Sequence, residues 1–162
     1  MRISLVALPF FALAACGGPD EGTVETTDGT AEYSVDETGG DTQIRFTDNE
    51  GNETVLNTGT EVEASLPDGF SVYPGASVVS NTTMSGGNGN GALVSIQSDD
   101  KPAEVIAYYR QQAEAAGIDI QMEMQNGQAT MIGGESEDGL FFSFNASPEA
   151  GGTAGVLMVG QQ

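Results

Sequence analysis

Alternation of apolar and polar side chains predicts most of the elements of this chain. Residues 42–47, Thr-Gln-Ile-Arg-Phe-Thr, alternate as a strand with one buried face should. Turn-forming residues follow at 48–52, and the apolar pair Val55-Leu56 begins a return. Residues 42–57 are therefore predicted to form a β-hairpin.

The second half of the chain shows six further strand patterns and one helix pattern. Strands are expected at 76–80, 92–96, 118–124, 140–144 and 154–159, and Asn126-Gly127 is a strong hairpin signal leading into 128–132. The glycine-rich run 85–91 is expected to be a hairpin connection. It is not followed by the Lys-Ser or Lys-Thr pair of a phosphate-binding loop.

The helix is expected at about 101–116. Asp99 and Asp100 are candidate caps at its start, and Gly117 is a left-handed cap at its end. Tyr108 and Tyr109 are adjacent, so only one ring is expected to face inward. The buried stripe is defined by helical spacing and consists of Val105, Ile106, Tyr109, Ala113 and Ala116.

These patterns together predict an α+β fold in two layers. A mostly antiparallel sheet carries one long helix on one face, and the hairpin at about 42–57 is added at the amino-terminal side. Strands 92–97 and 118–124 are expected to run parallel through the helix if they share a sheet. The domain is expected at 31–162, with its main unit at about 66–160. Residues 16–30 hold few apolar side chains and are expected to form a flexible stalk.

Methionines recur in the second half, at positions 122, 124, 131 and 158. Thioether sulfurs on one strand face select soft metals such as copper. Ile118 and Ile120 continue the alternation of Met122 and Met124, however, so this face is expected to be packed in the core.

Charge and composition exclude several functions. The chain holds 24 acidic and 4 basic residues, a formal net charge of −20. Such a field repels nucleic acid, so no nucleic acid partner is expected. Histidine is absent and Cys16 is the one cysteine, which removes the commonest general base and metal ligand. We therefore expect no enzyme activity, no catalytic residue and no cofactor.

The amino-terminal residues indicate secretion. Arg2 precedes an apolar run from Ile3 to Ala15, which is shorter than the ~20 residues of a transmembrane helix. The run ends in Leu13-Ala14-Ala15-Cys16, which resembles the lipobox of bacterial lipoprotein signals. The resemblance implies removal of residues 1–15, acylation of Cys16 and a lipid-anchored place in the bacterial cell envelope. The residue after Cys16 is Gly17. An aspartate at this position would resemble the signal that retains lipoproteins at the inner membrane, so its absence favours the outer membrane.

A second resemblance covers residues 66–159. Its motifs are Leu-Pro-Asp-Gly-Phe at 66–70, Tyr-Pro-Gly-Ala at 73–76 and Asp-Lys-Pro-Ala-Glu-Val at 100–105 with Tyr108-Tyr109. They resemble small secreted and lipoprotein domains of bacteria with no assigned function. The resemblance implies a fold and an envelope setting, and no reaction.

Two functional readings follow. The first is a non-enzymatic envelope lipoprotein that binds an unknown envelope protein, through an exposed sheet face, a sheet edge or the glycine loop, or serves a structural surface role. The alternative is a cation or small-ligand binder. Its weak metal candidates are Asp48, Glu50 and Asn52, with a second acidic cluster at Glu135, Glu137 and Asp138. Counted from Asp48, the glycine falls fourth where an EF-hand has it sixth, so a turn is favoured over an ion site.

Overall fold

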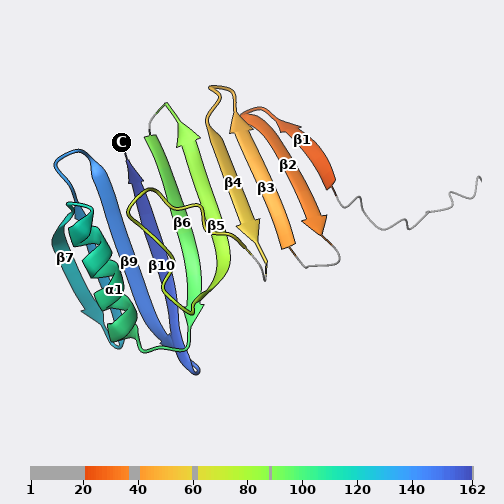
Figure 1. Ribbon diagram of the computed structural model, residues 1–162. Helices are drawn as coiled ribbons and strands as arrows, with labels where there is room; N and C mark the ends of the chain where they lie inside the picture. The colour runs from red at the N-terminus through yellow and green to blue at the C-terminus, as the bar shows by residue number, and fades with distance from the viewer. Residues whose placement is uncertain (1–20, 37–40, 60–61, 88, 162) are drawn as a thin grey trace, which may run out of the picture.

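The computed structural model describes residues 21–36, 41–59, 62–87 and 89–161. Cys16 and the predicted signal peptide lie outside these residues. The described part of the chain forms ten strands and one helix (Figure 1). The elements are β1 (Glu21–Thr26), β2 (Gly29–Asp36), β3 (Asp41–Asp48), β4 (Glu53–Thr58), β5 (Ser77–Gly86), β6 (Gly89–Ser98), α1 (Pro102–Ala115), β7 (Asp119–Asn126), β8 (Ala129–Glu135), β9 (Leu140–Glu149) and β10 (Gly152–Gln161).

All ten strands belong to one open sheet, in the order β1-β2-β3-β4-β5-β6-β10-β9-β8-β7. Every pair of neighbours is antiparallel. Because direction alternates along this order, β6 and β7 run parallel, joined through α1, with β10, β9 and β8 between them. The predicted α+β fold, a mostly antiparallel sheet with one helix, is confirmed, and so is the hairpin at 42–57.

The amino-terminal strands correct one prediction. Residues 21–30, expected to be part of a flexible stalk, form β1 and the start of β2. Their backbone is paired along the hairpin, with Val24 opposite Ala31, and the Thr26 hydroxyl donates to the Gly29 carbonyl at 2.9 Å. Threonine suits a pleated strand, and ladder hydrogen bonds do not require apolar side chains. A low apolar content therefore does not mark a stalk here.

The helix packs on one side of one end of the sheet, over β7 to β10. Val105, Ile106, Tyr109 and Ala113 are buried, as their spacing predicts. The Tyr109 ring lies 4.2 Å, centre to centre, from the ring of Phe144 on β9. Tyr108 is only half-buried, so one ring of the adjacent pair faces inward.

Both ends of the helix can be compared with their predicted caps. Neither Asp99 nor Asp100 caps the start: Lys101 is the N-cap residue, and its N–H donates to the Glu104 carboxylate at 3.3 Å. Asp100 instead accepts a hydrogen bond from the Tyr73 hydroxyl at 2.8 Å. Gly117, with φ +78°, follows the last turn in the left-handed region, as expected.

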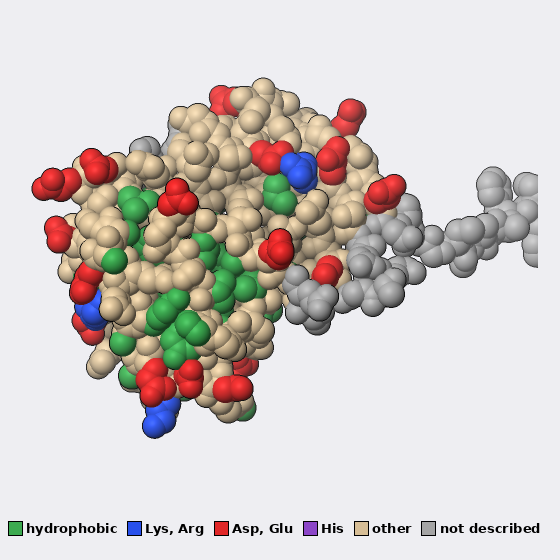
Figure 2. All heavy atoms as spheres, in the orientation of Figure 1, with side chains coloured by type: hydrophobic (Ala, Val, Ile, Leu, Met, Phe, Trp, Pro, Cys, Tyr) green, Lys and Arg blue, Asp and Glu red, His purple; other side chains and the backbone are tan. Residues whose placement is uncertain are grey.

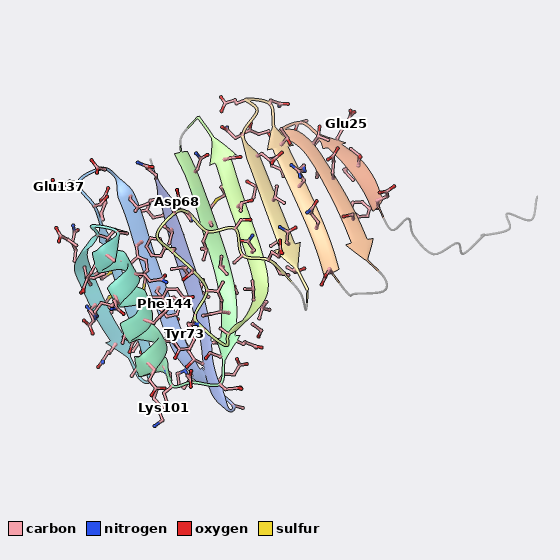
Figure 3. The ribbon with its side chains drawn as sticks, viewed as in Figure 1. Glu25, Asp68, Tyr73, Lys101, Glu137 and Phe144 are labelled. Carbon is pink, nitrogen blue, oxygen red and sulfur yellow. The ribbon has the colours of Figure 1, made fainter. Side chains whose placement is uncertain are left out.

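The segment 62–76 crosses the same side of the sheet and completes the core. Phe70 stacks on Phe142 with ring centres 5.7 Å apart. The Tyr73 N–H donates to the Tyr109 hydroxyl oxygen at 3.1 Å. Figure 3 places Tyr73 and Phe144 between this segment, the helix and the sheet, and Figure 2 shows hydrophobic side chains gathered there. The core therefore lies on one side of the sheet only.

Candidate binding surface

The second side of the sheet carries no covering layer among the residues that the structure describes. We call the side that faces α1 the helix side and the opposite side the open face. Along β6, Val94 and Ile96 belong to the helix-side core. Leu93 and Ser95 alternate with them and therefore lie on the open face. The strand register extends this assignment to every strand, because directly paired residues share a face.

Two rows of the open face, one across all ten strands and one from β7 to β3, carry no charged side chain. One row runs Met122, Gly133, Ser143, Met158, Leu93, Thr82, Leu56, Ile44, Tyr33 and Gly22. The next runs Met124, Met131, Asn145, Val156, Ser95, Ser80, Thr58 and Thr42. In a chain with net charge −20 this is an unusual surface. It suits contact with an uncharged partner rather than with a basic one.

A β-bulge in β7 overturns the prediction that the methionines are core residues. Ile120 pairs with Gly134, but Met122 pairs with Gly133, so one extra residue stands in β7. The alternation therefore changes sides: Ile120 keeps the helix side, whereas Met122 and Met124 reach the open face. Met122 is 37% and Met124 53% exposed.

Glycine makes this bulge possible. A Cβ on Gly134 would stand 1.9 Å from the Asp119 carbonyl oxygen, so the two backbones approach more closely than any side chain permits. The pair Gly133-Gly134 inside an otherwise apolar strand is the one sequence signal for this feature, because glycine in a strand marks a bulge or a close backbone approach. Reasoning from alternation alone misses it.

The exposed methionines lie at an edge of the sheet. β7 is the last strand in the order, and all of its residues except Ile120 are exposed. We call Met122, Met124 and Met131 the methionine patch; Met124 and Met131 are directly paired. Glu123 points to the helix side, where its carboxylate pairs with Arg110 at 2.7 Å. The half of β7 after the bulge therefore presents uncharged side chains on the open face and one neutralised carboxylate behind it.

A shallow hollow of about 640 Å³ lies at the other end of the open-face strands. Met84 and Phe141 line it, together with Gly91. A Cβ on Gly160 would stand 2.5 Å from the Phe141 ring, which shows that this ring lies directly over the glycine. Much of the predicted glycine-rich connection belongs to the strands, because β5 ends at Gly86 and β6 begins at Gly89. These two strand ends form one rim of the hollow.

The acidic turn is built as a turn. The Asp48 carboxylate accepts hydrogen bonds from the N–H groups of Glu50 and Asn52, both at 2.9 Å, and from the Asn52 side-chain amide at 2.7 Å. These bonds, the Asn52 side chain first, hold the pKa of Asp48 below its usual value. Asn52 also accepts from the Gly87 N–H at 3.0 Å, so it ties two hairpin connections together. Glu50 is exposed, and Glu135, Glu137 and Asp138 are exposed around the turn after β8.

The tyrosines of the helix side serve packing. Burial raises the pKa of Tyr109 to about 12, and the hydrogen bond to Asp100 raises the pKa of Tyr73. The Tyr108 hydroxyl lies 2.8 Å from the Ser71 hydroxyl. All three hydroxyl groups thus connect segment 62–76 to its surroundings.

Within residues 21–36, 41–59, 62–87 and 89–161 no group of three or more acidic, His or Cys side chains is arranged to hold a metal ion. In the same ranges, no helix has the length and apolar character needed to cross a bilayer.

Comparison with known proteins bears on part of the chain. Residues 78–153 match a family model described as START domain-like. The match begins in β5 and ends at the start of β10, just under half of the chain, and leaves β1–β4 outside. It says nothing about the amino-terminal signal. No curated protein and no solved structure matches this chain.

Proposed function

We propose that this chain is a lipid-anchored protein of the bacterial cell envelope that binds a protein partner and catalyses no reaction. The anchor is the acylated Cys16, and Gly17 favours the outer membrane. Support comes from the order of Arg2, the apolar run and Cys16. Each methylene group buried in the bilayer contributes about 0.8 kcal/mol to membrane binding, so several acyl chains hold a protein on a membrane almost permanently.

The observation that carries partner binding is the exposed second half of β7. An edge strand presents unpaired backbone N–H and C=O groups, and proteins usually guard such an edge with charged side chains. Here the one carboxylate after the bulge, Glu123, is neutralised by Arg110 on the helix side. Met122 and Met124 flank it on the open face. From Met122 to Asn126, where β7 pairs regularly with β8, the edge strand therefore presents no unpaired charged side chain.

The partner that fits this edge is an extended, uncharged segment of another protein. Such a segment adds as an eleventh strand beside β7, with backbone hydrogen bonds supplying affinity. Its apolar side chains rest on the methionine patch. Methionine is flexible and polarisable, and it adapts to partners of differing shape. A basic partner is disfavoured, because the contact surface offers no carboxylate to pair with it.

Site-specific photocrosslinking in intact cells tests this function. A photoreactive phenylalanine analogue is placed at position 124 and, as a matched control, at position 84. Met84 is 40% exposed on the same open face but lies on the interior strand β5. We expect one defined protein to be crosslinked from position 124 and not from position 84. Met122→Asp in the position-124 background should lower the yield at least tenfold, because it places an unpaired charge in the contact.

Three results would overturn the proposed binding mode. The first is the same crosslinked proteins from both positions, which indicates unspecific collision. The second is no crosslink from position 124. The third is a crosslink from position 124 to a second copy of this chain, which indicates self-association in place of partner binding.

A further inference from the structure

The strands β1–β4 form an amphipathic sheet that contributes one buried apolar side chain, Val55, to the helix side. Their helix side carries the charged side chains Glu25, Glu32, Arg45 and Glu53, with Arg45 and Glu53 in an ion pair at 2.5 Å. Figure 3 shows Glu25 at this far edge, and Figure 2 shows acidic and basic side chains on the helix side there. The open face of the same strands holds what we call the apolar stripe: Val24, Ala31, Tyr33, Ile44, Phe46 and Leu56.

Nothing in the described part of the chain covers the apolar stripe. The helix contacts only β7 to β10, and segment 62–76 packs on the helix side. Val24 is 52% and Ile44 40% exposed. Of the charged side chains of β1–β4, only Asp48, at the end of β3, lies on the open face among those that the structure describes. A contiguous exposed apolar area with most charges on the reverse side marks a contact surface rather than a solvated one.

The position of the stripe relative to Cys16 identifies its occupant. Glu21, the first residue of β1, follows Cys16 by five positions. A chain rises at most about 3.6 Å per residue, so Glu21, where β1 begins, stays within roughly 18 Å of the acylated cysteine. A tether of this length holds the stripe beside the bilayer at an effective concentration on the order of millimolar or higher.

The area of the apolar stripe alone is small for a stable protein interface, so the nearby lipid anchor decides which surface the stripe meets. Four strands spaced about 4.8 Å apart, each 6 to 8 residues long at about 3.3 Å per residue, offer on the order of 400 Å². A stable protein interface buries about 800 Å² on each partner. A membrane surface needs no such area, because the anchor already supplies the association.

We propose that the apolar stripe lies on the bilayer surface that holds the lipid anchor, with Tyr33 and Phe46 at the level of the head groups. The charged side of β1–β4 faces away from the lipid, so the acidic residues are not pressed against it. Contact is shallow, because the free backbone groups of edge strand β1 are not tolerated in the hydrocarbon region. The inference rests on the proposed anchor at Cys16, which brings the stripe to the membrane.

The absence of tryptophan from the chain permits a direct test. Ile44→Trp introduces a single indole on the open face, and Gln43→Trp introduces one at the neighbouring position on the helix side. The full lipidated protein carrying either variant is incorporated into phosphatidylcholine vesicles with and without brominated acyl chains, which quench indole fluorescence at short range. Val24→Trp and Thr23→Trp form a second matched pair on β1, and circular dichroism checks that each variant is folded.

We expect brominated lipid to quench the Ile44→Trp and Val24→Trp indoles at least threefold more strongly than those of Gln43→Trp and Thr23→Trp. Equal quenching within each pair, or none in any variant, while the protein remains on the vesicles, overturns this inference alone. An unquenched but blue-shifted Ile44→Trp indole also overturns it, since the stripe is then covered by protein. Failure of the wild-type chain to carry lipid or to stay with vesicles overturns the proposed function instead.

Discussion

The two parts of the sheet place their apolar side chains on opposite faces. In β6, β10 and β9 the buried residues, such as Val94, Leu157 and Phe144, lie on the helix side under α1 and segment 62–76. In β1–β4 the helix side carries charged and polar side chains beside the buried Val55, and the apolar stripe lies on the open face. Both parts show the same alternation in sequence. The difference teaches that alternation predicts an amphipathic strand, whereas the covering layer decides which face becomes a core.

The change of side occurs at β5. One cross-sheet row of the helix side runs Gln43, Asn57, Asn81, Val94 and Leu157, from polar to apolar. Asn81 stands at the transition, 1% exposed, with its amide donating to the Glu63 carbonyl at 3.3 Å and its side-chain oxygen without a hydrogen-bond partner. The match to the START domain-like family begins in this same strand. We call β5–β10 with α1 and segment 62–76 the closed part, and β1–β4 the open part. The match, residues 78–153, lies within the closed part and leaves the open part outside.

The largest expected difference between the two parts concerns truncation of an apolar side chain. Phe144→Ala should lower the free energy of unfolding by about 3–5 kcal/mol, because Phe144 is fully buried and the cavity cannot close. Ile44→Ala should lower it by less than about 1.5 kcal/mol, because Ile44 is already 40% exposed. Urea unfolding of detergent-solubilised protein measures both. Equal losses would show that the open part is covered in the free chain.

Alkaline pH should weaken the closed part through Tyr109. Its pKa is about 10 in the unfolded chain and about 12 when buried, so the folded state retains the proton more tightly. The resulting stabilisation, about 2 kcal/mol, is fully present below pH 10 and is lost as pH rises from 10 to 12. Urea unfolding at a series of pH values should show this decline in the wild type and a smaller one in Tyr109→Phe. Parallel curves for the two proteins would remove the assignment to Tyr109.

Glycines beneath aromatic rings offer a matched pair. A Cβ on Gly155 would meet the Phe144 ring at 2.7 Å inside the core, and one on Gly22 would meet the Tyr33 ring at 2.6 Å on the open face. Gly155→Ala should cost about 1–3 kcal/mol, since the enclosed ring cannot move aside. Gly22→Ala should cost less than about 1 kcal/mol, because the Tyr33 side chain is only partly buried and its ring can move aside. A larger loss for Gly22→Ala in thermal unfolding would contradict the open assignment of this face.

The smallest effect is expected at the acidic turn between β3 and β4. Asp48→Ala removes the acceptor of the Glu50 and Asn52 N–H groups. Those two amide protons should exchange with deuterium faster, while the core of β9 and β10 keeps its protection. Calcium at millimolar concentration should leave the exchange at both amides unchanged in the wild type. Slower exchange with calcium would restore the cation-binding alternative at Asp48, Glu50 and Asn52.

Much of the fold is predictable from the sequence because strand and helix periods are local properties. The helix is expected at about 101–116 and found at Pro102–Ala115, and the hairpin at 42–57 is found as β3 and β4. Predictions fail where the outcome depends on a neighbouring strand. The ladder of β1 is made by β2, and the side taken by Met122 depends on a bulge opposite Gly133-Gly134. The sequence favours a sheet edge or face as a candidate binding surface, but only the strand order shows that β7 is an edge strand.

The proposed membrane contact depends most directly on Cys16, because the lipid anchor brings the open face of β1–β4 to the membrane. Cells producing the wild-type chain or Cys16→Ala are labelled with a palmitate analogue, and their membranes are separated on a density gradient. We expect the wild type to take up label and to sediment with the outer membrane, and Cys16→Ala to take up none and to leave the membrane fraction while remaining folded. A wild type without label, or a Cys16→Ala variant that stays equally membrane-bound, would contradict the account.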